Sequence, residues 1–217
     1  MCGPGSKVSR ARSGGGRKRP VEILTPGEVH ALLGACSRRG SAGVRNRALI
    51  VVLWRGGLRI SEALALRPVD VDLQTGAVTI LHGKGDQRRV IGLDPMAIAV
   101  LEEWLGRRRA LGIGPRKALF CTFSSRRARP LDQAYVREML SRLRVRAGVE
   151  KRVHPHGFRH TFTAEAISEG VPLNVVQRQL GHGSLHTTDR YAAHVLPKDV
   201  IDRMRSRSWP APAPPTP

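Results

Sequence analysis

Apolar positions recur at helical spacing along most of this chain. Between Thr25 and about Arg38 they lie three or four residues apart, and the segment Thr25–Glu28 ahead of them has the form of a capping box. The run from Arg45 to Trp54 is apolar on nearly all sides, which is typical of a buried helix. Between these segments, Gly40–Gly43 predicts a loop. The folded part therefore opens with two helices, of which the second is buried.

A short hairpin then interrupts the helical pattern. After a third helix expected at Ile60–Leu66, which stops before Pro68, the runs Ala77–Leu81 and Arg88–Leu93 have the composition of strands. The polar and glycine-containing residues 82–87 join them, so Lys84 is expected near a hairpin tip.

Helices return after the hairpin. We expect them over residues 94–108, 132–147, 156–169 and 171–181, followed by short helices at 184–193 and 197–205. This order predicts a mainly α fold with a small antiparallel β-sheet, in the α+β class. It also predicts one folded domain over residues 21–205, flanked by a disordered basic arm at 1–20 and a disordered Pro-rich tail at 206–217.

Composition adds a strong positive charge. The 217 residues include 37 Lys and Arg against 17 Asp and Glu, which gives a net charge of +20, and 31 of the basic residues are Arg. With 41% hydrophobic residues the chain is too apolar for a disordered tail, so it is expected to be a folded protein that binds nucleic acid. A high-GC codon bias would explain the Arg/Lys ratio but not the net charge.

Other classes are disfavoured. Three scattered cysteines, Cys2, Cys36 and Cys121, give neither a disulfide framework nor a metal-ligand spacing. The sequence contains no run of about 18 apolar residues, and its N-terminus lacks the apolar segment of a signal peptide. We therefore expect a cytoplasmic, nucleoid-associated protein, with Cys36 and Cys121 as small core residues.

Chemically active side chains gather in the C-terminal third. The segment 154–160 reads His-Pro-His-Gly-Phe-Arg-His, Leu180-Gly181-His182 follows, and Tyr191 comes nine residues after His182. Imidazoles can move protons near neutral pH, a guanidinium binds phosphate with forked geometry, and a phenol can be a covalent nucleophile. These groups suit chemistry on a phosphodiester, and Arg59 and Lys84 supply further positive charge.

These elements, in this order and at these spacings, resemble the catalytic domain of tyrosine recombinases, also called phage-type integrases. The resemblance runs from about Ile23 to Asp202 and implies the tyrosine recombinase catalytic-domain fold. It implies a catalytic set that consists of Arg59, Lys84, His156, Arg159, His182 and Tyr191. Phe158 departs from the leucine usual at its motif position, which we interpret as a change of packing only.

The resemblance also implies roles. Tyr191 would be the nucleophile that forms a 3′-phosphotyrosyl link, and Arg59 and Arg159 would clamp the phosphate. Lys84 would protonate the leaving 5′ oxygen, and His182 would donate a hydrogen bond to a phosphate oxygen. An arbitrary helical tyrosine is usually a packing residue, but the sequence around Tyr191 favours the nucleophile. Tyr135, which lacks that context, is interpreted as a packing residue or a DNA contact.

His156 would act as an acid or base, or contact the phosphate. His156 and His160 are four residues apart, a spacing that also suits a metal pair on one helix face, but no further ligands appear at suitable spacing. We therefore expect no metal and no other cofactor, with His160 in a structural role and the remaining histidines solvated. Glu62, three residues after Arg59, is expected to support the site by orienting a cation.

Further basic and polar side chains are candidates for DNA contacts. They lie in the basic loop 124–129 and on the outer face of the helix that follows it, and comprise Arg126, Arg127, Arg129, Gln133 and Arg137. The resemblance implies double-stranded DNA as the partner, a homo-tetramer on DNA, and no membrane. Typical integrases also carry an N-terminal core-binding domain, for which there is no room ahead of Val21. The chain thus resembles the short single-domain members, or a truncated product whose core-binding domain or accessory protein is supplied by a partner.

The resemblance therefore implies a site-specific DNA recombinase that acts in integration, excision or inversion and needs neither metal nor ATP. Two alternatives remain open. A type IB topoisomerase-like activity would use the same chemistry but religate the original strand, and a catalytically silent DNA-binding relic would bind without forming an adduct.

Overall fold

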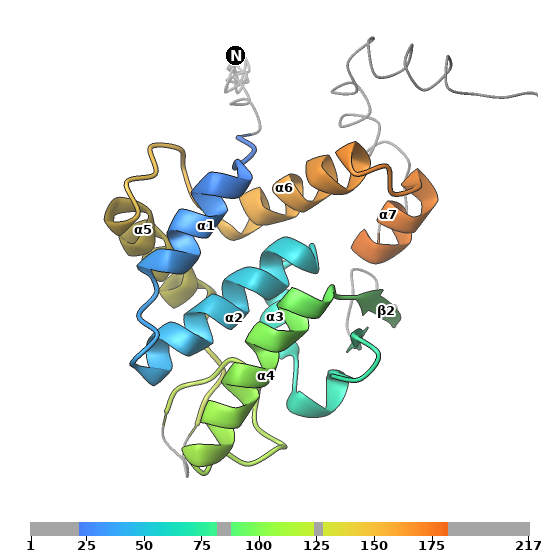
Figure 1. Ribbon diagram of the computed structural model, residues 1–217. Coiled ribbons are helices and arrows are strands. Elements are labelled where there is room, and N and C mark those ends of the chain that lie inside the picture. Colours follow the sequence, from blue (N-terminus) through green and yellow to red (C-terminus); the bar gives the residue numbers. More distant parts are fainter. Residues whose placement is uncertain (1–21, 82–87, 124–127, 182–217) are drawn as a thin grey trace, which may run out of the picture.

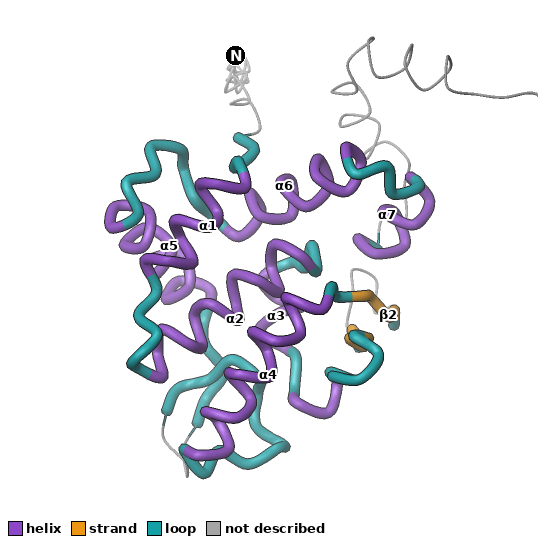
Figure 2. The backbone as a smooth tube through the Cα atoms, viewed as in Figure 1, coloured by secondary structure: helices purple, strands orange, loops and turns teal. Residues whose placement is uncertain are grey.

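The computed structural model describes residues 22–81, 88–123 and 128–181. Their elements in chain order are α1 (Pro26–Ala35), α2 (Ser41–Arg55), α3 (Ile60–Ala65), the 3-10 turn η1 (Pro68–Asp70), β1 (Ala77–Ile80), β2 (Arg89–Gly92), α4 (Pro95–Ala110), α5 (Gln133–Arg146), α6 (Pro155–Ser168) and α7 (Leu173–Leu180) (Figure 1). Helices make up most of these residues, and the strands are confined to one small antiparallel sheet (Figure 2). This confirms the predicted fold class.

Helix α2 forms the centre of the core. Its residues from Ala48 to Leu53 are at most 4% exposed, and it packs against α4 on one side and α6 on another (Figure 1). Each leucine, isoleucine or valine side chain buried in this way contributes about 1.5–3 kcal/mol. Because α2 ends at Arg55, its core position fixes where the following turn, residues 56–59, is held.

Local capping signals set three helix starts where the sequence predicts them. The Thr25 hydroxyl accepts from the Glu28 backbone N–H at 3.2 Å, and the Glu28 carboxylate accepts from the Thr25 N–H at 2.7 Å, which is the predicted capping box. At the starts of α4 and α5, the side chains of Asp94 and Asp132 each accept a hydrogen bond from the backbone N–H three residues later.

The helix boundaries around residues 36–41 differ from the prediction. The expected loop at Gly40–Gly43 is wrong, because α2 already begins at Ser41 with Gly40 as its cap. Helix α1 ends at Ala35 and not near Arg38, since the backbone of Cys36 is extended. The Arg47 guanidinium of α2 donates to the Leu33 carbonyl at 2.8 Å, so a side chain satisfies the end of α1 and the chain can turn early.

The small sheet lies beside the last helix. Strands β1 and β2 pair from Ala77 opposite Gly92 to Ile80 opposite Arg89, which confirms the two predicted strands. The connection 82–87 lies outside the described residues. Strand β2 also packs against α7, and the Gln179 side chain near the end of α7 bonds to Gly92 of β2.

Helix α6 has an unexpected cap. The Nδ1 atom of His154 accepts a hydrogen bond from the Gly157 N–H at 3.2 Å, so the prediction of a solvated His154 without a role is wrong. Burial, followed by the charge of Arg152, lowers the pKa of His154, which favours the neutral ring that this hydrogen bond needs. The cap fixes the start of the helix that carries His156 and Arg159.

Of the remaining expectations about the fold, the one on the cysteines is confirmed, and several others lie outside the described residues. Cys36 and Cys121 are buried core residues as predicted. The basic arm 1–20, the Pro-rich tail 206–217 and the helices expected at 184–193 and 197–205 lie outside the described residues. Within the described segments, no helix has the length and apolar character that crossing a membrane requires.

Candidate active site

Arg159 joins three parts of the fold. The residue is only 3% exposed, and its Nη1 and Nη2 donate to the carbonyl oxygens of Gly57 and Leu180, each at 2.7 Å. Burial, followed by the neighbouring charge of Arg59, lowers the pKa of Arg159 to about 9. The guanidinium therefore stays charged at neutral pH while it connects α6 to the end of α2 and the end of α7.

The turn after α2 requires a glycine. Gly57 has φ +61°, and a Cβ there would lie 2.7 Å from the Phe162 ring and 2.9 Å from the Leu180 side chain. A side chain at this position would push α6 and α7 away. The glycine allows the backbone to approach both helices, which brings its carbonyl to Arg159 and places Arg59 two residues later at the start of α3.

Glu62 holds Arg59 against this turn. Its carboxylate accepts from Arg59 Nη1 at 2.8 Å and from the Arg59 backbone N–H at 2.9 Å. Burial raises the pKa of Glu62, but hydrogen bonds from Arg89 and the Arg59 backbone, with the nearby positive charges, outweigh it and leave the pKa below its usual value. Glu62 is thus an ionised carboxylate, and its geometry fits a residue that orients cations and does not donate a proton.

Arg89 is a site residue that the sequence did not reveal. From β2 its Nη1 and Nη2 donate to the two oxygens of Glu62 at 2.9 and 2.8 Å, and its Nε donates to the Gln179 carbonyl at 3.2 Å. Its position in a basic strand gave no signal of this role. Only the strand register and the docking of α7 on β2 bring it to Glu62.

Helix α6 carries two histidines one turn apart, of which His156 lines a cleft next to the arginines. The rings of His156 and His160 are 4.1 Å apart and nearly perpendicular. His156 is exposed toward solvent, yet the surrounding protein removes enough water to lower its pKa, and the charges of Arg159, His154 and Arg59 add to this. The ring of His156 is therefore neutral near pH 7, the form that can accept a proton.

An arginine-lined cleft extends from His156 along α5. It has a volume of about 740 Å³, and its charged lining consists of Arg137, Arg144 and Arg152 together with Glu22 and Glu150, beside His154 and His156. Three guanidinium groups against two carboxylates leave a small excess of positive charge, which suits an anion.

Three of the predicted DNA contacts lie among the described residues, and one of them lines this cleft. Arg137 lines it, and its Nη2 donates to the exposed Gln133 at 3.0 Å. Gln133 and the exposed Arg129 are not among the residues that line the cleft.

The other predicted site residues lie outside the described segments. They are Lys84, Arg126, Arg127, His182 and Tyr191. The described chain ends at Gly181, one residue after the Leu180 carbonyl that binds Arg159, so His182 follows this contact directly in sequence.

Tyr135 takes part in packing. Its hydroxyl accepts from Arg45 Nη2 at 2.6 Å, and the Arg45 guanidinium lies 4.7 Å from the Phe123 ring centre and 5.3 Å from that of Tyr135. Arg45 Nη1 also donates to the Cys121 carbonyl at 3.0 Å. These contacts support the packing interpretation of Tyr135, and they tie the chain on both sides of residues 124–127 to α2.

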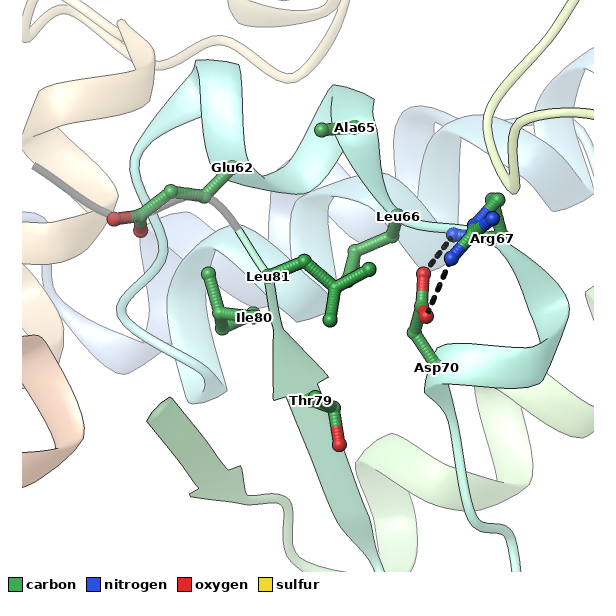
Figure 3. A pocket seen from close by; sticks show the side chains of 8 residues that line it. All are labelled: Glu62, Ala65, Leu66, Arg67, Asp70, Thr79, Ile80 and Leu81. Atoms are coloured by element: carbon green, nitrogen blue, oxygen red, sulfur yellow. Dashed lines mark hydrogen bonds and ion pairs between the residues drawn. The ribbon is translucent and has the colours of Figure 1, made fainter. Parts of the chain in front are cut away.

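A second cavity lies behind Glu62 and is not part of this site. Figure 3 shows it between α3, η1 and β1, with the Arg67–Asp70 pair at one end and Glu62 at the other. It measures about 280 Å³, and neither Arg59 nor Arg159 lines it. In the described segments, no group of three or more His, Cys, Asp or Glu side chains is arranged to hold a metal ion.

A buried Arg159, a partly exposed Arg59 bonded to an ionised carboxylate, and a neutral histidine beside an arginine-lined cleft are typical of a class of protein that binds phosphodiesters. The chain belongs to the phage integrase family, whose sequence model matches residues 22–196. This confirms the resemblance seen in the sequence.

Individual relatives of this chain are named tyrosine recombinases. Tyrosine recombinase XerD of Halalkalibacterium halodurans is 32% identical over 185 residues, which cover 85% of this chain and 61% of the relative. Tyrosine recombinase XerC of Xanthomonas axonopodis pv. citri is 39% identical over 149 residues, 69% of this chain and 47% of the relative. The chain thus spans about three fifths or less of the length of these two relatives.

Solved structures are similar as well. The crystal structure of XerA recombinase has a TM-score of 0.71 and 28% identity, and the match covers 87% of this chain and 66% of that one. XerH site-specific recombinase bound to its palindromic difH substrate has a TM-score of 0.67 and 31% identity, over 86% of this chain and 53% of that one.

Proposed function

We propose that this protein is a site-specific DNA recombinase that exchanges strands through a 3′-phosphotyrosyl intermediate. The observation that carries the proposal is that two arginines from segments far apart in the chain lie together beside an arginine-lined cleft. Arg59 is bonded to the buried carboxylate of Glu62, and Arg159 lies close enough for the charges of Arg59 and Glu62 to act on it. Membership of the phage integrase family and relatives named tyrosine recombinases support it.

In the proposed reaction the Tyr191 hydroxyl attacks the scissile phosphorus and the bond to the 5′ oxygen breaks. The phenol proton passes to a base, for which the neutral ring of His156 is suited. Lys84 protonates the departing 5′ oxygen. Arg59 and Arg159, with His182, stabilise the extra negative charge of the transition state.

The second half of the reaction reverses the first. A 5′ hydroxyl of the partner duplex attacks the phosphotyrosine, the new strand forms, and Tyr191 regains its proton. Since the bond energy is kept in the covalent link, the chemistry itself needs neither ATP nor a metal.

Assembly and location are part of the same proposal. Two DNA sites would be held by a homo-tetramer, with a core-binding domain or an accessory protein completing the grip on DNA. Arg126, Arg127, Arg129, Gln133 and Arg137 would contact double-stranded DNA, mostly at its phosphates. With this function we propose a cytoplasmic, nucleoid-associated protein.

Covalent trapping tests the proposal. The protein is mixed with EDTA and nicked duplexes tiled across the DNA that flanks its gene, and adducts are separated on denaturing gels. The wild type and Tyr135→Phe should form an adduct, while Tyr191→Phe should form none. Tyr135 is the matched control because the sequence holds only these two tyrosines.

Three outcomes would contradict the proposal. An adduct that persists in Tyr191→Phe would exclude this nucleophile. No adduct from a folded protein that binds DNA, even with a related core-binding domain added in trans, would favour the catalytically silent relic. Relaxation of supercoiled plasmid that lacks a target site would instead favour the type IB topoisomerase-like activity.

A further inference from the structure

The side chain of Arg89 faces inward and connects three segments of the site. It is 13% exposed, it binds both oxygens of Glu62, and its Nε donates to the carbonyl of Gln179 in α7. A planar guanidinium can make these three contacts together, whereas an ammonium on a flexible chain cannot. Arg89 is therefore placed to connect segments of the protein to one another.

Gln179 strengthens the same connection. Its side-chain amide donates to the Gly92 carbonyl at 2.8 Å and accepts from the Gly92 N–H at 3.0 Å, which pairs α7 with the outer edge of β2. Gly181 leaves room for Arg89, because a Cβ there would lie 2.8 Å from Arg89 Nε. Strand β2 and the end of α7 are thus held as one unit.

Each end of this unit supports one arginine of the proposed phosphate clamp. At one end, Glu62 accepts two hydrogen bonds from Arg59 and two from Arg89, which fill the four acceptor positions of a carboxylate. At the other end, the Leu180 carbonyl, one residue after Gln179, binds Arg159. A shift of Arg89 would therefore displace the groups that hold Arg59 and Arg159.

We propose that Arg89 is a positioning residue that aims Arg59 and Arg159 at the scissile phosphate through Glu62 and the end of α7. This inference rests on the proposed recombinase function. Arg89 itself does not touch DNA, since its guanidinium is directed to Glu62 and Gln179 and mostly covered. Its neighbour Arg88 is exposed and provides a matched control.

The first test needs no catalysis. Arg89→Lys and Arg88→Lys both keep the net charge, and the reaction of each arginine with phenylglyoxal is followed by peptide mass spectrometry. The rate at Arg59 should rise about threefold or more in Arg89→Lys and stay at the wild-type value in Arg88→Lys. Arg108, which is 2% exposed and bonded to backbone carbonyls, reports on global unfolding and should not change. An unchanged rate at Arg59, or equal rises at Arg59 and Arg108, would overturn the inference.

The second test measures cleavage in a single turnover at saturating nicked DNA. Arg89→Lys should cleave about 10- to 100-fold more slowly than Arg88→Lys, with DNA affinity changed less than about threefold, because a small misplacement of reacting groups is costly. On a scissile methylphosphonate, which lacks the phosphate charge, this gap should narrow to less than about threefold. Equal losses on both substrates, or wild-type cleavage by Arg89→Lys, would refute the positioning role. If the wild type forms no adduct even with a related core-binding domain added in trans, the proposed function fails, while the Arg59 rate still decides the role of Arg89.

Discussion

Replacing Glu62 with glutamine exchanges one carboxylate oxygen, which bonds to Arg59 and Arg89, for an amide nitrogen. The amide keeps the shape of the side chain but turns one acceptor oxygen into a donor that faces N–H groups of Arg59 or Arg89. It also leaves the Arg89 guanidinium, whose side chain is 13% exposed, without its counter-charge. The variant therefore tests whether Glu62 stabilises this part of the fold.

The structure sets the expected size of this effect. Removing one partner of a buried, hydrogen-bonded ion pair costs about 3–5 kcal/mol, and the partial exposure of Arg59 points to the lower end, about 3 kcal/mol. With a urea m-value of about 2 kcal/mol/M for a domain of this size, the midpoint should fall by about 1.5 M. The matched control is Glu138→Gln, which removes an exposed pair with Arg142 on α5 and should cost about 0.5 kcal/mol or less.

Urea unfolding followed by circular dichroism measures both variants, and pH adds a second test. Since folding holds the pKa of Glu62 below its usual value of 4.5, the stabilisation is complete above about pH 4.5 and is lost as the pH falls further. The difference in urea midpoint between the wild type and Glu62→Gln should therefore become smaller as the pH falls below about 4.5. A midpoint shift no larger than that of Glu138→Gln, or a gap independent of pH, would refute the reasoning.

Three further predictions test other parts of the site. Gly181→Ala should lower the free energy of unfolding by about 2 kcal/mol, because φ is +64° there and the new Cβ would meet Arg89; a urea midpoint equal to wild type would contradict this. His154→Asn keeps a cap for the Gly157 N–H but cannot be protonated, and folding lowers the pKa of His154 below 6.5. The wild type should therefore lose more stability than this variant as the pH falls from about 7.5 to about 5, and parallel urea midpoints would contradict the cap. Arg137→Gln should reduce the slope of log affinity against log salt by about 0.9 in fluorescence anisotropy with duplex DNA, and an unchanged slope would remove Arg137 from the interface.

Much of the fold follows from signals that act within a few residues. The Thr25–Glu28 capping box and the Asp132 cap could be found in the sequence because each satisfies N–H groups three residues away. The strands of the hairpin could be found for the same reason, since their composition and the turn residues between them are local. Where helix ends depend on distant partners, as at the end of α1, the prediction failed.

The arginine cluster shows the opposite case. Arg59, Glu62 and Arg159 were found through their motif context, but nothing local marks Arg89 as the partner of Glu62. Its contact depends on the pairing register of β2, on the docking of α7 and on the glycine at 181, which are decided by the whole core. His154 was missed for a simpler reason, because histidine is uncommon as a cap and only the geometry of its Nδ1 atom identifies it.

The balance of charge in this cluster gives the strongest physical reason for an anionic ligand. Among the described residues, Arg59 and Arg89 bond to the carboxylate of Glu62, and the almost completely buried Arg159 lies close enough for the charges of this cluster to act on it. Burial and the neighbouring cation lower the pKa of Arg159 to about 9, so the folded protein holds this charge at a cost in stability. A phosphate seated between Arg59 and Arg159 would supply the missing negative charge, and the same attraction increases as a phosphorane forms. In the proposed function the site would therefore be least favourable without a phosphate and most favourable around the transition state, as phosphoryl transfer requires.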